Sequence, residues 1–515
     1  MTARAFDAAR PDLRLGIVGA GAMGRGIAQI AATAGVTVKL HDARPGAADE
    51  ARTFAAGMLK RAAERGRMSD AEAAAAADRM RVADALADLA DCHIVVEAIV
   101  EDLDAKRALF ADLESAVGDG CVLATNTSSL SVTAIAAACR RPGRVAGFHF
   151  FNPVPLMRVV EVIDGARTDP ATCDALVALA ERMGHRPVRA KDTPGFLVNH
   201  AGRGYGTEAL RILGEGVATV ADIDRVMREA CGFPMGPFEL MDLTGLDVSH
   251  PVMESIYRQF YDEPRFRPLP ETARRVAAGL LGRKTGEGFY RYTEGKRQEE
   301  PEPAPPPDRP RAVWCSLAEP EAGERLATFL RSLPGDVPVA TDATPPPDAL
   351  CLVTPLGADA TTAACDQGLD PTRTLAVDIL PGLDRRLTVM ATPLTSAAHR
   401  RAAHGLLTAG GLSVTVIADS PGFIAQRILA SVVNVACDIA QMRIATPADI
   451  DDAVRLGLGY PKGPLALGDA HGPRRLLTVL ERLQATTGDP RWRPSPWLRR
   501  RALLGVSLTT PDIAG

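Results

Sequence analysis

The sequence predicts an α/β domain built on a doubly wound parallel sheet, followed by an all-helical domain and by a degenerate second copy at the C-terminus. Three observations support this. Short apolar runs alternate with helical segments in the first third of the chain, the pattern turns mostly helical near residue 191, and two sequence blocks return late in the chain. Strands that alternate with helices form parallel sheets covered on both faces.

The first predicted unit is a strand, a glycine turn, a helix and a second strand, RLGIVGAGAMGRGIAQIAATAGVTVKLHD at residues 14–42. LGIV is a short apolar run, the stretch after it has no proline, and VTVKL alternates as a strand does. CHIVVEAI and CVLATN predict further buried strands, and each precedes a helical segment, EDLDAKRALFADLESA and SVTAIAAAC. We therefore expect a dinucleotide-binding domain of the Rossmann type over residues 1–190.

The next segments are predicted from composition. From KDTPGFLVN onward the chain is mostly helical, with a break at GFPMGP, and GRKTGEGFYRY closes a helical domain that we expect over residues 191–296. QEEPEPAPPPDRPR follows, and it is rich in proline and acidic residues and poor in core-forming ones. We interpret residues 297–311 as a linker.

An internal repeat organises the rest. KDTPGFLVN (191–199) returns as ADSPGFIAQ (418–426), and TVADIDRVMREACGFPMGPFELMD (219–242) returns as TPADIDDAVRLGLGYPKGPLALGD (446–469). The separation within each pair is the same, which indicates a duplicated domain. We expect a second helical domain over residues 418–515. Residues 312–417 are then a degenerate α/β segment without the glycine motif.

Composition restricts the class of protein. The net charge is −4 and 24% of the residues are charged, so nothing indicates a nucleic-acid or membrane-surface protein. No apolar run reaches the ~18 residues of a transmembrane helix, and the start lacks the apolar core of a signal peptide. Nine cysteines are scattered without CxxC pairs, which is typical of reduced thiols without zinc. We expect a cytoplasmic protein without a metal site.

The glycine turn has the spacing Gly19-x-Gly21-x-x-Gly24 between a strand and a helix. The first glycine permits the turn, the second lets the backbone approach a pyrophosphate, and the third allows close helix packing. Asp42, at the end of the second strand, is suited to bind both ribose hydroxyls of adenosine and would repel a 2′-phosphate. The pattern therefore favours NAD over NADP, although Arg44 lies nearby.

Two polar clusters follow later strands of the predicted sheet. TNTSSLS (125–131) places Asn126 and Ser128 where a doubly wound sheet binds its ligands, but the same residue types cap helices. GFHFFNP (147–153) holds His149 between Phe148 and Phe150, which is compatible with a core histidine or with a base in a dry site. MRVVEVI predicts a strand that carries a buried Glu161, and a buried glutamate needs a partner. A strand returning beside His149 would supply one, and a carboxylate makes histidine a better general base.

Taken in order, GAGAMGRGIA, VVEAIVED, NTSSL, FHFFNPVPLMRVVEV, KDTPGFLVN, GFPMGPFELMD and GRKTGEGFY resemble the L-3-hydroxyacyl-CoA dehydrogenase family. The resemblance covers residues 14–292 and, more weakly, 418–497. The two-part layout is similar to the long bacterial members, including those that oxidise 3-hydroxybutyryl-CoA or 3-hydroxyadipyl-CoA in aromatic-acid breakdown. The implied reaction is NAD-dependent oxidation of an (S)-3-hydroxyacyl-CoA to the 3-oxoacyl-CoA.

The resemblance implies roles for particular residues. His149 takes the proton of the substrate hydroxyl, Glu161 stabilises the imidazolium, and Ser128 and Asn199 hydrogen-bond around the substrate oxygen. Phe148 and Phe150 would then exclude water beside the nicotinamide. Asn152 helps to position His149. The implied cofactor-binding set is Gly19, Gly21, Ala22, Met23, Gly24, Asp42, Glu101, Lys106, Asn126, Ser128 and Asn152, with Glu101 and Lys106 on the nicotinamide-ribose side.

Other expectations stay open at this point. MLKRAAERGR (58–67) is basic, so Lys60 is a candidate for the CoA phosphates, or this is a solvated helix face. His200 follows Asn199 where the family usually has arginine. The second copy has Gln426 opposite Asn199 and no counterpart of Ser128, His149 or Glu161, so we expect it to be non-catalytic. It would cover from within the chain the surface that pairs subunits in shorter members, giving a monomer or homodimer. The alternatives are a gulonate-type dehydrogenase of a free hydroxy acid and a non-catalytic NAD-binding protein.

Overall fold

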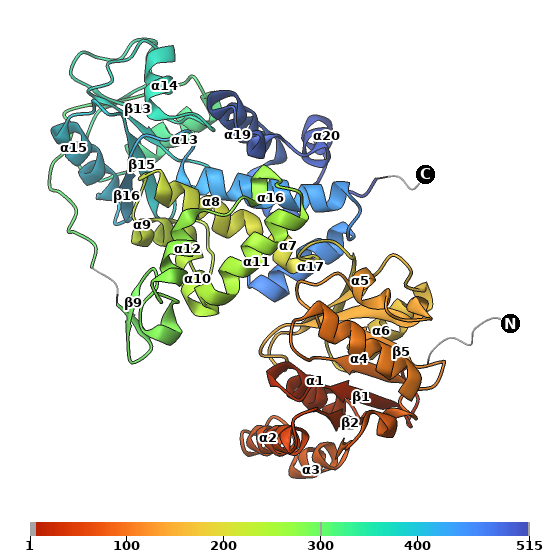
Figure 1. The fold of residues 1–515 in the computed structure, drawn as a ribbon. Helices are drawn as coiled ribbons and strands as arrows, with labels where there is room; N and C mark the ends of the chain where they lie inside the picture. Colours follow the sequence, from red (N-terminus) through yellow and green to blue (C-terminus); the bar gives the residue numbers. More distant parts are fainter. Residues whose placement is uncertain (1–6, 299–300, 513–515) are drawn as a thin grey trace. The chain divides into compact units, whose positions relative to one another are not determined.

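The computed structural model describes residues 7–298 and 301–512, and divides them into two compact units. Unit 1 comprises residues up to His200 together with Met442–Leu458, and unit 2 comprises Ala201–Gln441 and Gly459 onward (Figure 1). Residues 299 and 300 of the predicted linker lie outside the described residues. No helix in the described part of the chain is both long and apolar enough to cross a membrane.

Unit 1 is built on an eight-stranded sheet in the order β3-β2-β1-β4-β5-β6-β7-β8, parallel except for the antiparallel pair β6·β7. Its strands are β1 (Arg14–Val18), β2 (Thr37–His41), β3 (Met80–Val82), β4 (Ile94–Glu97), β5 (Val122–Thr125), β6 (Val145–Phe150), β7 (Val159–Asp164) and β8 (Arg186–Lys191). Its helices are α1 (Ala22–Thr33), α2 (Ala47–Glu64), α3 (Asp70–Asp78), α4 (Leu103–Ala116), α5 (Val132–Ala136), α6 (Pro170–Arg182), most of α7 (Val198–Ala201), and α17 (Pro447–Leu458).

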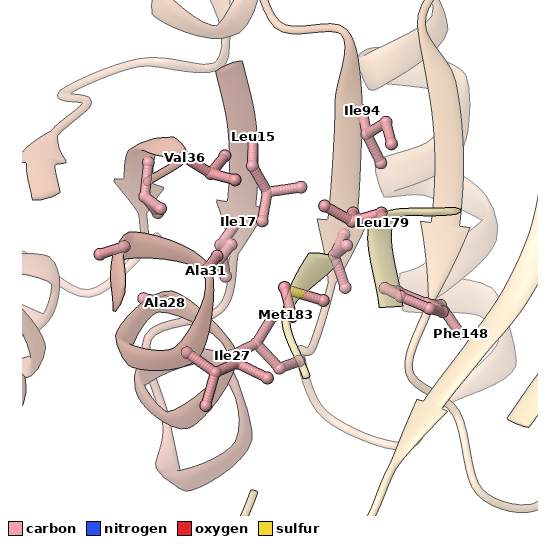
Figure 2. Close-up of a cluster of buried hydrophobic side chains, with 14 of the residues drawn as sticks. Leu15, Ile17, Ile27, Ala28, Ala31, Val36, Ile94, Phe148, Leu179 and Met183 are labelled. Carbon is pink, nitrogen blue, oxygen red and sulfur yellow. The ribbon is translucent and has the colours of Figure 1, made fainter. Parts of the chain in front are cut away.

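The two faces of this sheet bury separate apolar clusters because successive strand residues point to opposite sides. Ile94 and Val96 of β4 pack with Ile27 of α1 and Leu179 of α6, whereas the intervening Val95 packs in the other cluster. That second cluster also includes residues of α4 and α5. Figure 2 shows part of the first cluster, including Leu15, Ile17, Ile27, Phe148 and Met183. The predicted doubly wound architecture is confirmed.

Unit 2 contains a first helical region, a smaller sheet and most of a second helical region. The first region is α8 (Arg203–Gly214), α9 (Val220–Arg225), α10 (Pro237–Thr244), α11 (Leu246–Gln259) and α12 (Pro270–Ala277), followed by the hairpin β9 (Arg291–Thr293) and β10 (Lys296–Gln298). The second region is α16 (Ile424–Gln441), α18 (Pro464–His471), α19 (Pro473–Thr487) and α20 (Pro496–Leu504).

The smaller sheet has six strands in the order β12-β11-β13-β14-β15-β16, with one antiparallel pair, β14·β15. They are β11 (Val313–Cys315), β12 (Val339–Ala340), β13 (Leu350–Val353), β14 (Thr374–Val377), β15 (Leu387–Ala391) and β16 (Val414–Ile417), joined in part by α13 (Pro320–Arg331), α14 (Ala360–Asp366) and α15 (Ala397–Thr408). The antiparallel pair β14·β15 and the parallel edge strand β16 correspond to β6·β7 and β8 of the larger sheet. The second copy is therefore degenerate but retains this strand arrangement.

The two helical regions pack on each other within unit 2 through α8 and α16. A Cβ at Gly204 would lie 3.0 Å from the backbone of Ser431, so the two helix backbones approach closely. Arg427 is buried on α16 and forms ion pairs with Glu208 at 2.6 Å and Glu215 at 2.5 Å. Burying an unpaired arginine would cost free energy, so these two glutamates stabilise the contact between α8 and α16.

Candidate active site

The candidate site is centred on His149 of β6, which lies directly opposite Glu161 of the antiparallel strand β7. Opposed residues of an antiparallel pair place their side chains on the same face. His149 Nδ1 and Glu161 Oε2 are 2.5 Å apart, and the two side chains are 6% and 0% exposed. The predicted contact between these side chains is confirmed.

The other carboxylate oxygen of Glu161 is held by backbone. Leu197 N and Val198 N donate hydrogen bonds to Glu161 Oε1 at 2.9 and 2.8 Å. The turn that aims these groups has positive φ at Gly195 (74°) and at Phe196 (48°). A non-glycine residue in this region is uncommon, and here it lies beside the site. Both oxygens of a fully buried carboxylate are thus satisfied, and its orientation toward His149 is fixed.

The aromatic rings around His149 differ from those expected. The ring centroids of Phe151 and Phe196 lie 4.5 and 5.9 Å from that of the imidazole. Phe148 and Phe150 point to the opposite face of β6, with ring centroids 4.7 Å apart, and join the apolar core. Figure 2 shows Phe148 in this core. The prediction that Phe148 and Phe150 shield the nicotinamide side is wrong, since neighbours along a strand alternate between faces. Phe151 and Phe196 contact the imidazole instead.

Glu101 organises the TNTSSLS segment after β5. Its Oε1 accepts hydrogen bonds from Thr127 Oγ1 at 2.7 Å, Ser128 N at 2.9 Å and Ser129 Oγ at 2.9 Å. Burial acts to raise the pKa of Glu101, but these hydrogen bonds and the Lys106 ammonium lower it overall. An ionised Glu101 therefore fixes the loop that presents Ser128. Ser131, not Ser128, caps the helix that follows.

A buried ion pair that the sequence interpretation missed lies below this loop. Lys106 is 1% exposed, and its Nζ is 2.5 Å from Glu97 Oε1 and 3.4 Å from Glu101 Oε2. Thr125 Oγ1 donates to the second oxygen of Glu97 at 2.6 Å. Glu97 is the last residue of the apolar strand β4, and Glu161 lies within the apolar strand β7. Since a buried acid needs a partner, the reasoning that predicted a partner for Glu161 also predicts one for Glu97.

Asn126 and Asn199 have different surroundings. Asn126 Oδ1 accepts a hydrogen bond from Phe150 N at 2.9 Å, so it ties the end of β5 to the strand that carries His149. Asn199 is half-buried on α7, directly after the residues that hold Glu161, and His200 beside it is fully buried. Both asparagines are in unit 1 with the dyad.

The glycine loop has the shape that a dinucleotide requires. Gly19 has φ of +100°, and a Cβ there would overlap the carbonyl of Ala98, while one at Gly24 would overlap the carbonyl of Gly19. A Cβ at Gly21 would meet nothing within 4 Å, so this position opens outward. Gly21 is also the N-cap of α1, without a side-chain cap, which leaves backbone N–H groups for an anion. Ala22 and Met23 form the first turn.

Asp42 directly follows β2 and lies next to this loop. Its carboxylate accepts hydrogen bonds from Ala20 N at 2.7 Å and from Arg44 N at 2.8 Å. The Arg44 guanidinium forms an ion pair with Glu50 at 2.7 Å. The Arg44 cation, which would favour a 2′-phosphate, is therefore partly neutralised, and the residues present fit NAD.

A basic groove of about 900 Å³ extends from α1 and α2 to the loop that contains Asn152. Of the described residues that line it, none is acidic. The six arginines that line it are Arg25, Arg61, Arg65, Arg67, Arg158 and Arg182. Among the described residues, no carboxylate forms an ion pair with Arg61, Arg65 or Arg67. Lys60 is exposed on α2 and is not part of the lining.

The second copy has other residues at the positions of the dyad. Asp378 directly follows β14, and its backbone N donates to the carbonyl of Thr388 on β15 at 3.0 Å. Gln426, the counterpart of Asn199, donates through Nε2 to Asp378 Oδ1 at 3.0 Å. As expected, no histidine or glutamate stands at this strand pair. In the described ranges 7–298 and 301–512, no group of three or more metal-ligating side chains is found either.

Two family descriptions match the chain. The 3-hydroxyacyl-CoA dehydrogenase NAD binding domain matches residues 14–193. The 3-hydroxyacyl-CoA dehydrogenase C-terminal domain matches residues 195–292 and again residues 422–507. The helical domain is therefore present twice, as the internal repeat predicts.

Known proteins are similar over most of the chain. It is 37% identical over 489 residues to 3-hydroxyadipyl-CoA dehydrogenase of Escherichia coli (strain K12), covering 95% of this chain and 97% of that protein. It is 41% identical over 280 residues to a probable 3-hydroxybutyryl-CoA dehydrogenase of Deinococcus radiodurans, covering 54% of this chain and 100% of that protein.

A solved structure extends the likeness to the fold. The crystal structure of 3-hydroxybutyryl-CoA dehydrogenase from Escherichia coli K12 substr. MG1655 matches with a TM-score of 0.83 at 35% identity, covering 96% of this chain and 98% of that one. The likeness therefore includes both copies. It shows that the chain belongs to the 3-hydroxyacyl-CoA dehydrogenase family of NAD-dependent oxidoreductases.

Proposed function

We propose that the chain oxidises short-chain (S)-3-hydroxyacyl-CoA thioesters to 3-oxoacyl-CoA at the His149 site. The observation that carries the proposal is the buried His149–Glu161 pair, with the second oxygen of Glu161 held by two backbone N–H groups. A general base needs an oriented and stabilised imidazole, and this arrangement supplies both.

Each residue then has a role in the reaction. Nδ1 of His149 is engaged by Glu161, so Nε2 is the nitrogen that takes the proton from the substrate 3-hydroxyl. Bound NAD supplies the acceptor for the hydride that leaves C3. Glu161 stabilises the imidazolium at 2.5 Å, and Ser128 and Asn199 hydrogen-bond the substrate oxygen. Glu101 acts by holding Ser128 in place.

The cofactor residues divide into two groups. Gly19, Gly21, Ala22, Met23, Gly24 and Asp42 would hold the adenosine and pyrophosphate. Glu101, Asn126 and Asn152 would lie toward the nicotinamide ribose. Lys106 is buried and reaches the cofactor through Glu101, whose second oxygen it contacts at 3.4 Å.

The CoA phosphates are assigned to the basic groove. Six arginines and no acid line it, and CoA carries several phosphate charges beside an apolar chain. Arg61, Arg65 and Arg67 carry this role because they are not paired with carboxylates among the described residues. Arg65→Ala should raise the KM for the thioester about tenfold, as expected for one lost charged contact. Lys60→Ala is the matched control, and an equal effect of both variants would return the assignment to the whole basic helix.

The nature of the substrate is tested by NADH formation on a panel of thioesters. The relatives are named for 3-hydroxyadipyl-CoA and 3-hydroxybutyryl-CoA, so the panel includes both, with other chain lengths. The corresponding free acids separate this function from that of a gulonate-type enzyme. Higher kcat/KM on a free acid would refute the proposal, and no NADH from any substrate would favour a non-catalytic NAD-binding protein.

We also propose that the chain is a monomer in the cytoplasm. The contact between α8 and α16 already pairs the two helical regions within one chain. Among the described residues, which include all nine cysteines, no disulfide is formed, and this is typical of a reducing compartment. Sedimentation of the whole chain tests the first statement, and a dimer mass at micromolar concentration would contradict it.

A further inference from the structure

Helix α17 belongs by sequence to the second helical copy but packs on the sheet of the first. Within unit 1 it contacts β7 and β8. Arg186 on β8 forms ion pairs with Asp449 at 2.8 Å and Asp452 at 2.9 Å, both on α17. Lys191 N, at the end of β8, donates to the carbonyl of Ile444 at 3.0 Å. The degenerate copy thus contributes a helix to the unit that contains the dyad.

A reciprocal contact joins the first helical region to the smaller sheet of the second copy. In unit 2, Ala418 N donates to the carbonyl of Val217 at 3.0 Å. Ala418 is the repeat counterpart of Lys191, and Val217 is the counterpart of Ile444. Arg386 beside β15 also forms an ion pair with Glu229, just after α9, at 2.9 Å. Each sheet edge is therefore covered by a segment of the other copy, which is the reciprocity of an isologous dimer.

The α17 contact extends to the groups that hold Glu161. A Cβ at Gly457 of α17 would lie 3.1 and 3.2 Å from the methyl carbons of Val198 and 3.6 Å from Val159. Val198 N is one of the two donors to Glu161 Oε1, and Val159 is on β7, the strand of Glu161. Glycine at 457 leaves room for Val198 in its present place; a β-carbon there would require Val198 to shift by a few tenths of an ångström, and a branched side chain by more.

We propose that α17 of the degenerate copy is a positioning element for the His149–Glu161 dyad, with Gly457 as the positioning residue. The inference rests on the proposed function of that dyad. α17 packs against Val198 and Val159 through Gly457, while the Arg186 ion pairs with Asp449 and Asp452 hold the helix on the sheet edge. The second copy has lost its own dyad residues but still determines how the first copy's carboxylate is held.

The test uses Gly457→Val in the full chain. A bulky residue should displace the Val198 N–H from Glu161 and lower kcat about 10- to 100-fold, since misplacement of about 1 Å can cost about 100-fold. The KM for NAD should not change. The deuterium isotope effect with substrate labelled at C3 should rise, because the chemical step becomes slower relative to release. Adding Val198→Ala should restore part of kcat by making room.

The reciprocal contact supplies a matched control. Arg386→Gln breaks the ion pairs of Arg386 with Glu229 and Glu302 beside the degenerate sheet, and it should lower the melting temperature without changing kcat or the isotope effect. The double variant Asp449→Asn/Asp452→Asn removes both charges from α17 with little change of shape. It should lower kcat several-fold and tests the proposal if Gly457→Val does not fold.

The outcomes distinguish two failures. An active wild-type chain whose Gly457 and Asp449/Asp452 variants keep kcat and the isotope effect would refute the positioning role alone. A wild-type chain that forms no NADH from any thioester would refute the proposed function, and the inference with it.

Discussion

The two copies in this chain have the same order of elements but different residues at the antiparallel strand pair, which carries the His149–Glu161 dyad in the first copy. In the first, β6 and β7 place His149 opposite Glu161. In the second, the corresponding antiparallel pair places Asp378 beside Thr388. The sheet order around the pair is otherwise similar, because apolar packing maintains it. The comparison shows that a fold persists through its core while its chemistry depends on a few side chains.

Residues with a structural role are retained in both copies. Asp192 accepts hydrogen bonds from Val132 N at 3.1 Å and Thr133 N at 2.7 Å, at the start of α5. Asp419, its repeat counterpart, accepts from Ala360 N at 2.8 Å and Thr361 N at 3.2 Å, at the start of α14. The aspartate therefore caps the corresponding helix in both copies.

Residues that would face a ligand are not retained. Gln426 accepts from Gly357 N at 2.7 Å and donates to Pro355 O at 3.1 Å and to Asp378 at 3.0 Å. Its amide therefore makes all of these hydrogen bonds within the second copy. If only the first copy is catalytic, substitutions at corresponding positions of the two copies should have different effects.

The largest difference in kcat is expected between the variants His149→Gln and Asp378→Asn. His149→Gln should lower kcat by about 10²- to 10⁴-fold, the range of general-base assistance. Asp378→Asn should leave kcat unchanged because the second copy has no dyad. Steady-state NADH formation measures both. Equal losses in the two variants would show that the second copy takes part in the chemistry.

A smaller loss is expected at the supporting carboxylate. Glu161→Gln removes the charge that stabilises the imidazolium, while the amide oxygen can still accept the hydrogen bonds from Leu197 N and Val198 N. We expect kcat to fall about 100-fold while the KM for NAD changes little. Thr388→Val at the corresponding position is the control, and a decrease in its kcat would contradict the assignment.

Cofactor binding should distinguish the copies by stoichiometry. Calorimetric titration should give one NAD site per chain because only the first copy has the glycine turn. Asp42→Asn keeps an acceptor for Ala20 N but loses the charge, so NAD affinity should fall about tenfold and discrimination against NADP should narrow. Two sites per chain would show that the degenerate sheet also binds a dinucleotide.

The smallest effect concerns stability. Burial raises the pKa of Asp378 to about 6, from 3.8, against the hydrogen bonds from Gln426 and Leu380 N. The folded chain therefore binds this proton more tightly than the unfolded chain, and the stabilisation present below pH ~4 is lost as the pH rises through about 6. Asp378→Asn should raise stability by about 1 kcal/mol at pH 8 and have little effect at pH 4.

Thermal melting of wild type and variant at the two pH values measures this difference. The gain in melting temperature should be larger at pH 8 than at pH 4. A gain that is the same at both values would show that Asp378 is not protonated in the folded chain.

Much of the site was predictable from local sequence. Gly19, Gly21 and Gly24 follow an apolar strand, and Glu161 is an acid within β-branched residues, so each is recognisable without distant contacts. The assignments of Ser128, Asn199 and Lys60 depend on the family resemblance, and their roles stay predictions. The orientation of Phe148 and Phe150 was predicted wrongly, although strand alternation alone would have placed them in the core.

The sequence by itself determined the doubly wound fold, the duplication, the dinucleotide loop and the pairing of His149 with Glu161, because periodicity and short motifs act over a few residues. Only the tertiary structure decided that Glu101 and Lys106 support the Ser128 loop, that Phe151 and Phe196 contact the imidazole, and that α17 crosses to the other copy's sheet. Apart from Phe151, which is two residues from His149, those contacts join residues far apart in the chain. They depend on which surfaces fit together, and no local pattern encodes that.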